Sequence, residues 1–324
     1  MKHFPSLFVA AATVALLSAQ GAGAQMSVDP SIESYTPVQG VSGTLKSMGS
    51  DTMNNLMTLW AEGFKKFYPN VKIEIEGKGS STAPPALVAG TAQFGPMSRE
   101  MKDAERSDFK NEFGYNPSKI ATSIDLLAVY VNKDNPVKRL SLKDIDGIFS
   151  KTRNSGAKSI DTWGDLGLDG EWTSKPISLY GRNSASGTYG YIKENALGKG
   201  DFRDTVKEQP GSSAVVQAVA SDKYAIGYSG VGYKTADVRA VPLSKTPSGK
   251  AIEAAPENAY TGDYPLSRFL YIYVNAKPGT ALDPLRREFL RFVLSKQGQE
   301  VAVQDGYFPL TPALVQENKK ALGL

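Results

Sequence analysis

Two similar strands, far apart in the sequence, constrain the fold of this 324-residue chain more than any other feature. Residues 126–132 read LLAVYVN and residues 269–275 read FLYIYVN, so each is a nearly continuous apolar run that ends in Val-Asn. Such a run is typical of a strand that is buried on both faces of a sheet. Because the two strands bracket a middle section with strands of its own, we expect the chain to cross between two lobes twice.

The segments before the first of these strands alternate strand, polar loop and helix. A short strand at 45–48 is followed by Gly-Ser-Asp-Thr at 49–52, and then by apolar residues at helical spacing from Met53 to about Tyr68. The same order recurs around 71–88, and again from residue 92 to a charged helix near residue 100. This repetition predicts an α/β fold with a parallel sheet.

The first residues predict export from the cytoplasm. Residues 1–24 read as a secretory signal, with a positive charge at Lys2, an apolar run from Leu7 to Leu17, and an A-x-A cleavage site that ends at Ala24. Residues 25–42 carry prolines, serines and glycines with little periodicity, so we expect a flexible N-terminal arm. Beyond the leader, no apolar stretch of the sequence is long enough to span a bilayer.

Composition excludes several classes of catalysis and of metal site. The chain has no cysteine, and its one histidine is His3 in the leader. The mature chain would therefore lack Ser-His-Asp and Cys-His catalysis, zinc sites built from His or Cys, iron–sulfur clusters and disulfides. We expect no metal and no cofactor. The formal charge of +4 becomes +3 without Lys2, and no long basic run appears, so we also expect no nucleic-acid partner.

Four polar loops each follow a strand and precede a helix, which is the edge where ligands bind in open α/β sheets. The first turn of a helix offers free N–H groups and a partial positive charge, and hydroxyls there add donors, so the pattern favours an oxyanion. Arginine adds a charged fork that suits a tetrahedral oxyanion. The candidate binding residues in these loops are Ser50, Asp51, Thr52, Ser80, Ser81, Ser98, Arg99, Arg182, Ser186, Gly187 and Thr188.

Each loop also has a purely structural interpretation. Serine and threonine before a helix commonly act only as N-caps, and Arg182 or Arg99 alone would be an ordinary surface ion-pair partner. The recurrence of hydroxyl-rich helix starts is what favours a binding site. No glycine-rich loop has the spacing of a nucleotide-binding motif, which weighs against a nucleotide ligand.

From about Gly43 to Leu324, the chain resembles the PstS-type periplasmic phosphate-binding proteins that serve ABC transporters. The most specific element is Arg182-x-x-x-Ser-Gly-Thr, and Gly-Ser-Ser at 79–81, TAQFG at 91–95 and AIGY at 225–228 follow in the family's order. The resemblance implies a type II periplasmic binding protein fold, in which two α/β lobes are joined by two crossover strands. It also implies lobe boundaries, with lobe one at 43–124 and 265–324 and lobe two at 125–264.

The same resemblance implies a function without catalysis. The protein would be a monomer that binds inorganic phosphate in the periplasm and delivers it to membrane permease subunits. Thr52 and Ser80 would each offer a backbone amide and a hydroxyl, and Arg182 would form an ion pair with phosphate. Ser186, Gly187 and Thr188 would donate hydrogen bonds from the second lobe.

Two positions depart from the family pattern. Ser98 stands where the family commonly has an aspartate that accepts the proton of hydrogen phosphate and so rejects sulfate. We hypothesise that Asp51 takes this role, although it could instead cap the helix that begins at Met53. Ser184 stands where the family has an aspartate that aligns the arginine, so Arg182 is expected to find another partner.

Three other functions stay open at this point. A secreted phosphatase on the same scaffold would need Ser or Thr as a nucleophile, or a metal held by Asp and Glu. A sensor or scavenger that never meets a permease would share the site and differ in its partner. A binder of another tetrahedral oxyanion, such as sulfate or arsenate, would use the same donors.

Overall fold

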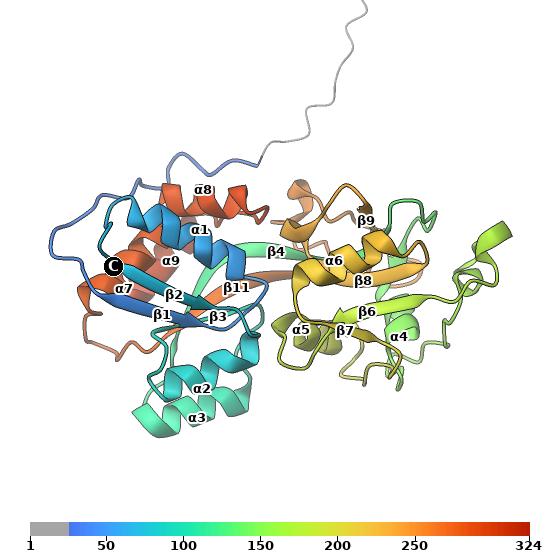
Figure 1. Ribbon diagram of the computed structural model, residues 1–324, viewed down its shortest axis with the longest axis horizontal. Coiled ribbons are helices and arrows are strands. Elements are labelled where there is room, and N and C mark those ends of the chain that lie inside the picture. Colours follow the sequence, from blue (N-terminus) through green and yellow to red (C-terminus); the bar gives the residue numbers. More distant parts are fainter. Residues whose placement is uncertain (1–25) are drawn as a thin grey trace, which may run out of the picture.

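The computed structural model describes residues 26–324, in which two lobes lie side by side (Figure 1). The expected two-lobe α/β fold is confirmed. We call the half that contains β1 to β3 lobe one, and the half that contains β6 to β8 lobe two. The leader and its cleavage site after Ala24 lie outside the described residues. Within these residues, no helix has the length and apolar character needed to cross a membrane.

One mixed sheet of nine strands runs through both lobes in the order β2-β1-β3-β11-β4-β8-β6-β7, and β9 pairs with β4. Each lobe contains parallel pairs, whereas β4 and β11 run antiparallel to each other. The strands are β1 (Thr44–Met48), β2 (Lys72–Glu76), β3 (Phe94–Met97), β4 (Ser118–Asn132), β6 (Ser178–Arg182), β7 (Lys207–Gln209), β8 (Ala225–Gly230), β9 (Val238–Ala240) and β11 (Ser267–Val274), and a separate pair is formed by β5 (Leu140–Ser141) and β10 (Leu243–Ser244).

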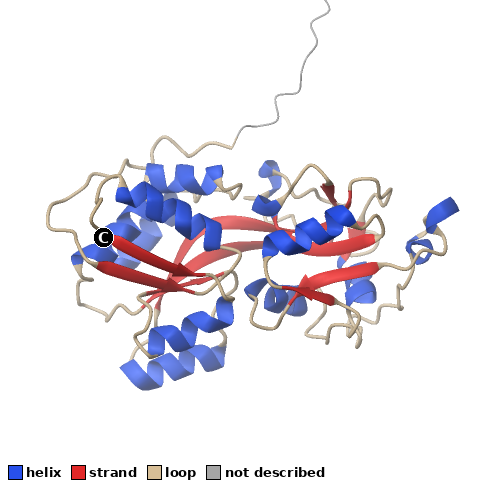
Figure 2. Ribbon diagram, in the orientation of Figure 1, coloured by secondary structure: helices blue, strands red, loops and turns tan. Residues whose placement is uncertain are grey.

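Helices cover the sheet in both lobes (Figure 2). Lobe one carries α1 (Asn54–Lys65), α2 (Ala83–Val88), α3 (Asp103–Phe113), α7 (Pro284–Val293), α8 (Lys296–Gln304) and α9 (Pro312–Leu322). Lobe two carries α4 (Leu142–Phe149), α5 (Gly187–Asn195) and α6 (Ser212–Ser221). The short 3-10 helices are η1 (Ser80–Thr82), η2 (Trp163–Leu166), η3 (Gly170–Trp172), η4 (Val231–Tyr233) and η5 (Pro256–Asn258).

The strands β4 and β11 join the lobes. Residues 118–126 of β4 pair with β11, and residues 127–131 pair with β8 of lobe two. Residues 126–131 are fully buried, as their unbroken apolar sequence predicts for a strand that is covered on both faces. The run at 126–131 therefore lies in lobe two beside β8, the run at 269–274 lies in lobe one beside β3, and the chain crosses between the lobes near the start of each run.

Residues 26–42 differ from the free arm that their sequence predicts. Ile32 and Tyr35 are buried in the hydrophobic core of lobe one. The Tyr35 hydroxyl lies 2.7 Å from the Tyr68 hydroxyl and donates a hydrogen bond of 3.0 Å to Glu288. Single side chains anchor this segment without a helix or strand, so its sequence carries no periodic pattern that would reveal the packing.

Asp305 follows α8 at a contact between the lobes. A methyl group on Gly232 in lobe two would lie 2.4 Å from the Asp305 carbonyl oxygen. Burial raises the pKa of the Asp305 carboxyl from 3.8 to about 6, although a hydrogen bond from Asn55 opposes the shift. Because the folded state holds the proton more tightly than the unfolded chain does, ionisation of Asp305 lowers the stability of the folded state.

We predict that Asp305→Asn stabilises the protein relative to wild type above about pH 6, and that this advantage fades toward about pH 4. The penalty is absent when Asp305 is protonated in both states, grows between the two pKa values, and is complete above the folded value. Urea unfolding of both proteins at several pH values measures the difference. Asp108→Asn, at an exposed position on α3, is the control. A difference that does not change between pH 4 and pH 7 would contradict the prediction.

Candidate functional site

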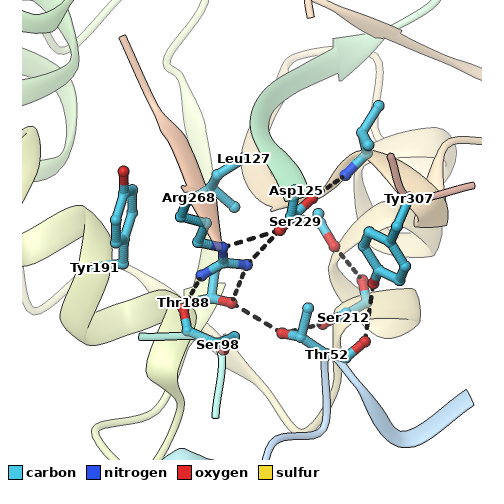
Figure 3. Close-up of polar contacts among 12 residues, drawn as sticks. Thr52, Ser98, Asp125, Leu127, Thr188, Tyr191, Ser212, Ser229, Arg268 and Tyr307 are labelled. Carbon is cyan, nitrogen blue, oxygen red and sulfur yellow. Dashed lines mark hydrogen bonds and ion pairs between the residues drawn. The ribbon is translucent and has the colours of Figure 1, made fainter. Parts of the chain in front are cut away.

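Hydroxyls from both lobes meet at the amino ends of helices between the lobes (Figure 3). The Thr52 Oγ1 atom, just before α1, lies 3.0 Å from Thr188 Oγ1 and 3.4 Å from Ser212 Oγ. Thr188 is in the first turn of α5 and Ser212 is the first residue of α6, and all three residues are buried. The polar loops that the sequence singles out therefore face one another across the two lobes.

A second contact brings lobe two against the loops after β2 and β3. The Ser98 backbone amide donates to Ser80 Oγ at 3.0 Å, and the two Oγ atoms are 3.4 Å apart. A methyl group on Gly187 would lie 2.2 Å from Ser80 Oγ and 2.6 Å from Ser98 Oγ. Glycine is thus required at this point for the close approach of α5 to lobe one. The Ser81 amide donates to the Ala185 carbonyl at 3.1 Å across the same contact.

Arg182 ends β6 and has 3% of its surface exposed. Its Nη1 atom donates to Ser212 Oγ at 2.8 Å and lies 3.2 Å from Asp51 Oδ2, and its Nη2 atom donates to the Pro210 carbonyl at 3.3 Å. Burial lowers the pKa of the Arg182 guanidinium and Asp51 opposes this, but arginine stays charged in proteins. Asp51 is therefore the partner of Arg182 in place of the aspartate that the family has at position 184. In this chain that position holds Ser184, which is exposed.

The Asp51 side chain reaches across to lobe two. Its Oδ2 atom accepts a hydrogen bond of 2.8 Å from the Ser212 amide, in addition to the contact with Arg182. No side chain caps α1, so the alternative role of Asp51 as a helix cap is not observed. The hydroxyls of Tyr233 and Tyr307 hold the loop by donating to the Thr52 carbonyl at 3.0 and 2.9 Å.

Two buried polar atoms of the candidate residues, Ser50 Oγ and Arg182 Nε, have no hydrogen-bond partner among residues 26–324. A buried donor without a partner costs free energy, which makes each of these atoms a candidate to bind a ligand acceptor. Ser186 is already engaged as the N-cap of α5, because its Oγ atom accepts from the amides of Thr188 and Tyr189. The amide of Gly187, the first residue of α5, has no partner within the helix.

Arg99 lies at the edge of this cluster, as part of an ion pair. Its guanidinium donates to both carboxylate oxygens of Glu105, at 2.8 and 2.7 Å, and to Ser81 Oγ at 3.2 Å. These contacts match the purely structural interpretation, in which Arg99 is an ion-pair partner. Arg99 and Ser186 both line a groove of about 860 Å³ between the lobes.

Three residues of the cluster are not among the candidates that the sequence predicts: Ser212, Asp125 and Arg268. Arg268 donates from Nε and Nη2 to Asp125 Oδ2, at 2.9 and 2.7 Å, and both side chains are buried. A signal for each was present. Gly211-Ser212 opens a helix as the four other polar loops do, and each member of the ion pair directly precedes one of the two similar apolar strands.

The arrangement is suited to an anion that receives many hydrogen bonds. Hydroxyl and amide donors come from both lobes, and each of the two arginines has a carboxylate partner, so the local formal charge is balanced. A charge-assisted hydrogen bond to an oxyanion contributes about 1.5–3 kcal/mol. In the described part of the chain, no group of three or more His, Cys, Asp or Glu side chains is placed to hold a metal ion.

Comparison with known proteins places the chain among binding proteins. A family described as the PBP superfamily domain matches residues 34–297. Phosphate-binding protein PstS of Pseudomonas aeruginosa is 53% identical, over 98% of both chains, and that of Staphylococcus haemolyticus is 31% identical, over 90% of this chain and 87% of the relative. A putative phosphate ABC transporter substrate-binding protein from Clostridium perfringens, solved with bound phosphate, is 25% identical with a TM-score of 0.70, over 83% of this chain and all of that one.

The contact at Gly187 leads to a prediction about closure. Gly187→Ala should weaken oxyanion binding about tenfold or more, because the added methyl group would hold α5 away from Ser80 and make the arrangement in which the two lobes touch rarer. Isothermal titration with phosphate measures this effect. The matched control is Gly190→Ala on the same helix, where the atom nearest to the new methyl group is Arg99 Cδ at 3.3 Å, a milder contact than the 2.2 Å at Gly187. Equal affinities for the two variants would contradict the prediction.

Proposed function

The chain belongs to the PstS family of phosphate-binding proteins, and we propose that it binds inorganic phosphate between its lobes and delivers it to the permease of an ABC transporter. The observation that carries the proposal is the convergence of hydroxyls and Arg182 from both lobes on one buried region, with two unpartnered donor atoms. The role requires no chemical step and no cofactor, and we propose that the protein is not an enzyme.

Binding in this region favours the closed form. The Thr52 and Ser80 loops belong to lobe one, whereas Arg182 and the first turn of α5 belong to lobe two. A ligand that accepts hydrogen bonds from both sets stabilises the arrangement in which the lobes touch. We propose that a permease recognises the closed form of the protein, in which phosphate is bound and the lobes touch.

Selectivity for phosphate depends on Asp51 in this proposal. Both of these contacts of the carboxylate use Oδ2, which pairs with Arg182 and accepts a hydrogen bond from the Ser212 amide. The second oxygen, Oδ1, is then the acceptor for the proton of hydrogen phosphate. Sulfate carries no proton at neutral pH, so it would face a carboxylate with nothing to donate. Asp51 would thereby combine the two roles for which the family uses two other aspartates.

The cellular setting is also part of the proposal. Residues 1–24 would direct export and be removed after Ala24, which would leave a monomer in the periplasm. Permease subunits of an ABC transporter would be its protein partner. The name of the structural relative from Clostridium perfringens, a phosphate ABC transporter substrate-binding protein, supports this pairing.

The proposal predicts micromolar or tighter binding of phosphate to the purified protein after bound phosphate has been removed. Isothermal titration with phosphate and with sulfate, at several pH values, is the measurement. Phosphate should bind more tightly than sulfate, because only phosphate donates a proton to Asp51. Failure to bind phosphate at micromolar concentrations would refute the function.

Asp51→Asn tests the proton acceptor. Phosphate affinity should fall at least about tenfold more than sulfate affinity, because the amide lacks the charge that makes a carboxylate the better acceptor. Ser184→Ala, at the exposed position in the Arg182 loop, is the control and should change neither affinity. An equal loss for both anions would mean that Asp51 only aligns Arg182.

A further inference from the structure

The buried Arg268 side chain has several contacts in addition to its ion pair with Asp125. It lies in β11 directly opposite Asp125 in β4, where the two strands pair. Its guanidinium makes four hydrogen bonds, and the Tyr191 ring lies over it with the ring centroid 5.4 Å from Cζ (Figure 3). The Arg268 side chain has 2% of its surface exposed and that of Asp125 has none. The plane and direction of this guanidinium are therefore fixed.

The two hydrogen bonds that do not go to Asp125 reach both lobes. Nη1 donates to the Ser98 carbonyl at 2.8 Å in lobe one, and Nη2 donates to Thr188 Oγ1 at 3.1 Å in lobe two. The Asp125 carboxylate is itself fixed, because its other oxygen accepts from the Val231 amide at 3.0 Å. Arg268 thus bonds the two sides of the candidate site from the strand that joins them.

The bond to Thr188 determines what the Thr188 hydroxyl can do. A guanidinium has only donors, so Thr188 Oγ1 must be the acceptor in this pair. The hydroxyl proton of Thr188 is then directed elsewhere, and Thr52 Oγ1 lies 3.0 Å away in the direction of the other site loops. Arg182 imposes the same constraint on Ser212, whose Oγ atom accepts from Nη1 at 2.8 Å. A hydroxyl fixed in this way is prepared to donate to an anion.

We propose that Arg268 is a positioning residue for the anion site: it fixes the Thr188 hydroxyl as a hydrogen-bond donor toward the ligand. This inference rests on the proposed binding of phosphate. Asp125 neutralises the charge of Arg268, so Arg268 acts through the orientation of Thr188 and not through a free positive charge. The expected consequence is that Arg268 and Thr188 contribute to affinity as one unit.

A double-mutant cycle tests this coupling. Thr188→Val removes the hydroxyl with little change in volume, and Arg268→Lys keeps the charge beside Asp125 but loses the fork that reaches both Asp125 and Thr188. Each single variant should weaken phosphate binding about tenfold, and the double variant should be no weaker than about tenfold as well. Thr188→Ser, which keeps the hydroxyl, should retain most of the wild-type affinity for phosphate. Titration calorimetry measures the affinities, and thermal unfolding without phosphate checks that each variant is folded.

The outcomes separate the inference from the function it rests on. A wild-type protein that does not bind phosphate would refute the proposed function. If the wild type binds, additive losses in the double variant, or wild-type affinity in Thr188→Val, would overturn the role of Arg268. Should Arg268→Lys fail to fold, the pair Asp125→Asn with Arg268→Gln removes both charges and enters the same cycle. Because Thr188→Val leaves the ion pair in place, its affinity alone can still overturn the proposal.

Discussion

The antiparallel pairing of β4 with β11 sets how the two lobes meet and where the candidate site forms. These two strands run from one lobe toward the other, and β4 changes its partner from β11 to β8 after Leu126. The buried pair of Asp125 and Arg268 lies at this change. A buried ion pair is costly to desolvate, and removing one partner is costlier still, so both charges are tied to this position. The lobes therefore meet at a point fixed by backbone pairing and by charge.

In the proposed function, the candidate site there binds an oxyanion through directed hydrogen-bond donors more than through net charge. Arg182 faces Asp51, and Arg268 faces Asp125, so neither arginine is a free cation. An oxyanion in such a place is stabilised by many hydrogen bonds in a region shielded from water, where each bond is stronger than in solvent. The proposed selectivity has the same origin, because a carboxylate beside the anion favours a ligand that still carries a proton.

Much of the candidate site is predictable from local sequence. The hydroxyls of Thr52, Ser80 and Thr188 and the guanidinium of Arg182 lie where the polar loops predict, between the lobes. Local sequence reveals these residues because each loop combines hydroxyls with a following helix, and the geometry of a helix start is a local property. Arg99 has the same local appearance, yet Glu105, six residues later, holds it in an ion pair. Local pattern does not show which carboxylate an arginine pairs with, which is Glu105 for Arg99 and Asp51 for Arg182.

The two-lobe fold follows from the amino-acid sequence alone, because two apolar strands bracket a middle section, and the loop that begins at Arg182 indicates the family. The folded structure pairs Asp51 with Arg182 and Asp125 with Arg268, and the members of each pair are distant in the chain. It also placed Ile32 and Tyr35 in the core of lobe one. The physical reason is common to all three cases. Secondary structure follows from periodicity among near neighbours, whereas ion pairs and isolated anchors form between segments whose proximity exists only after folding.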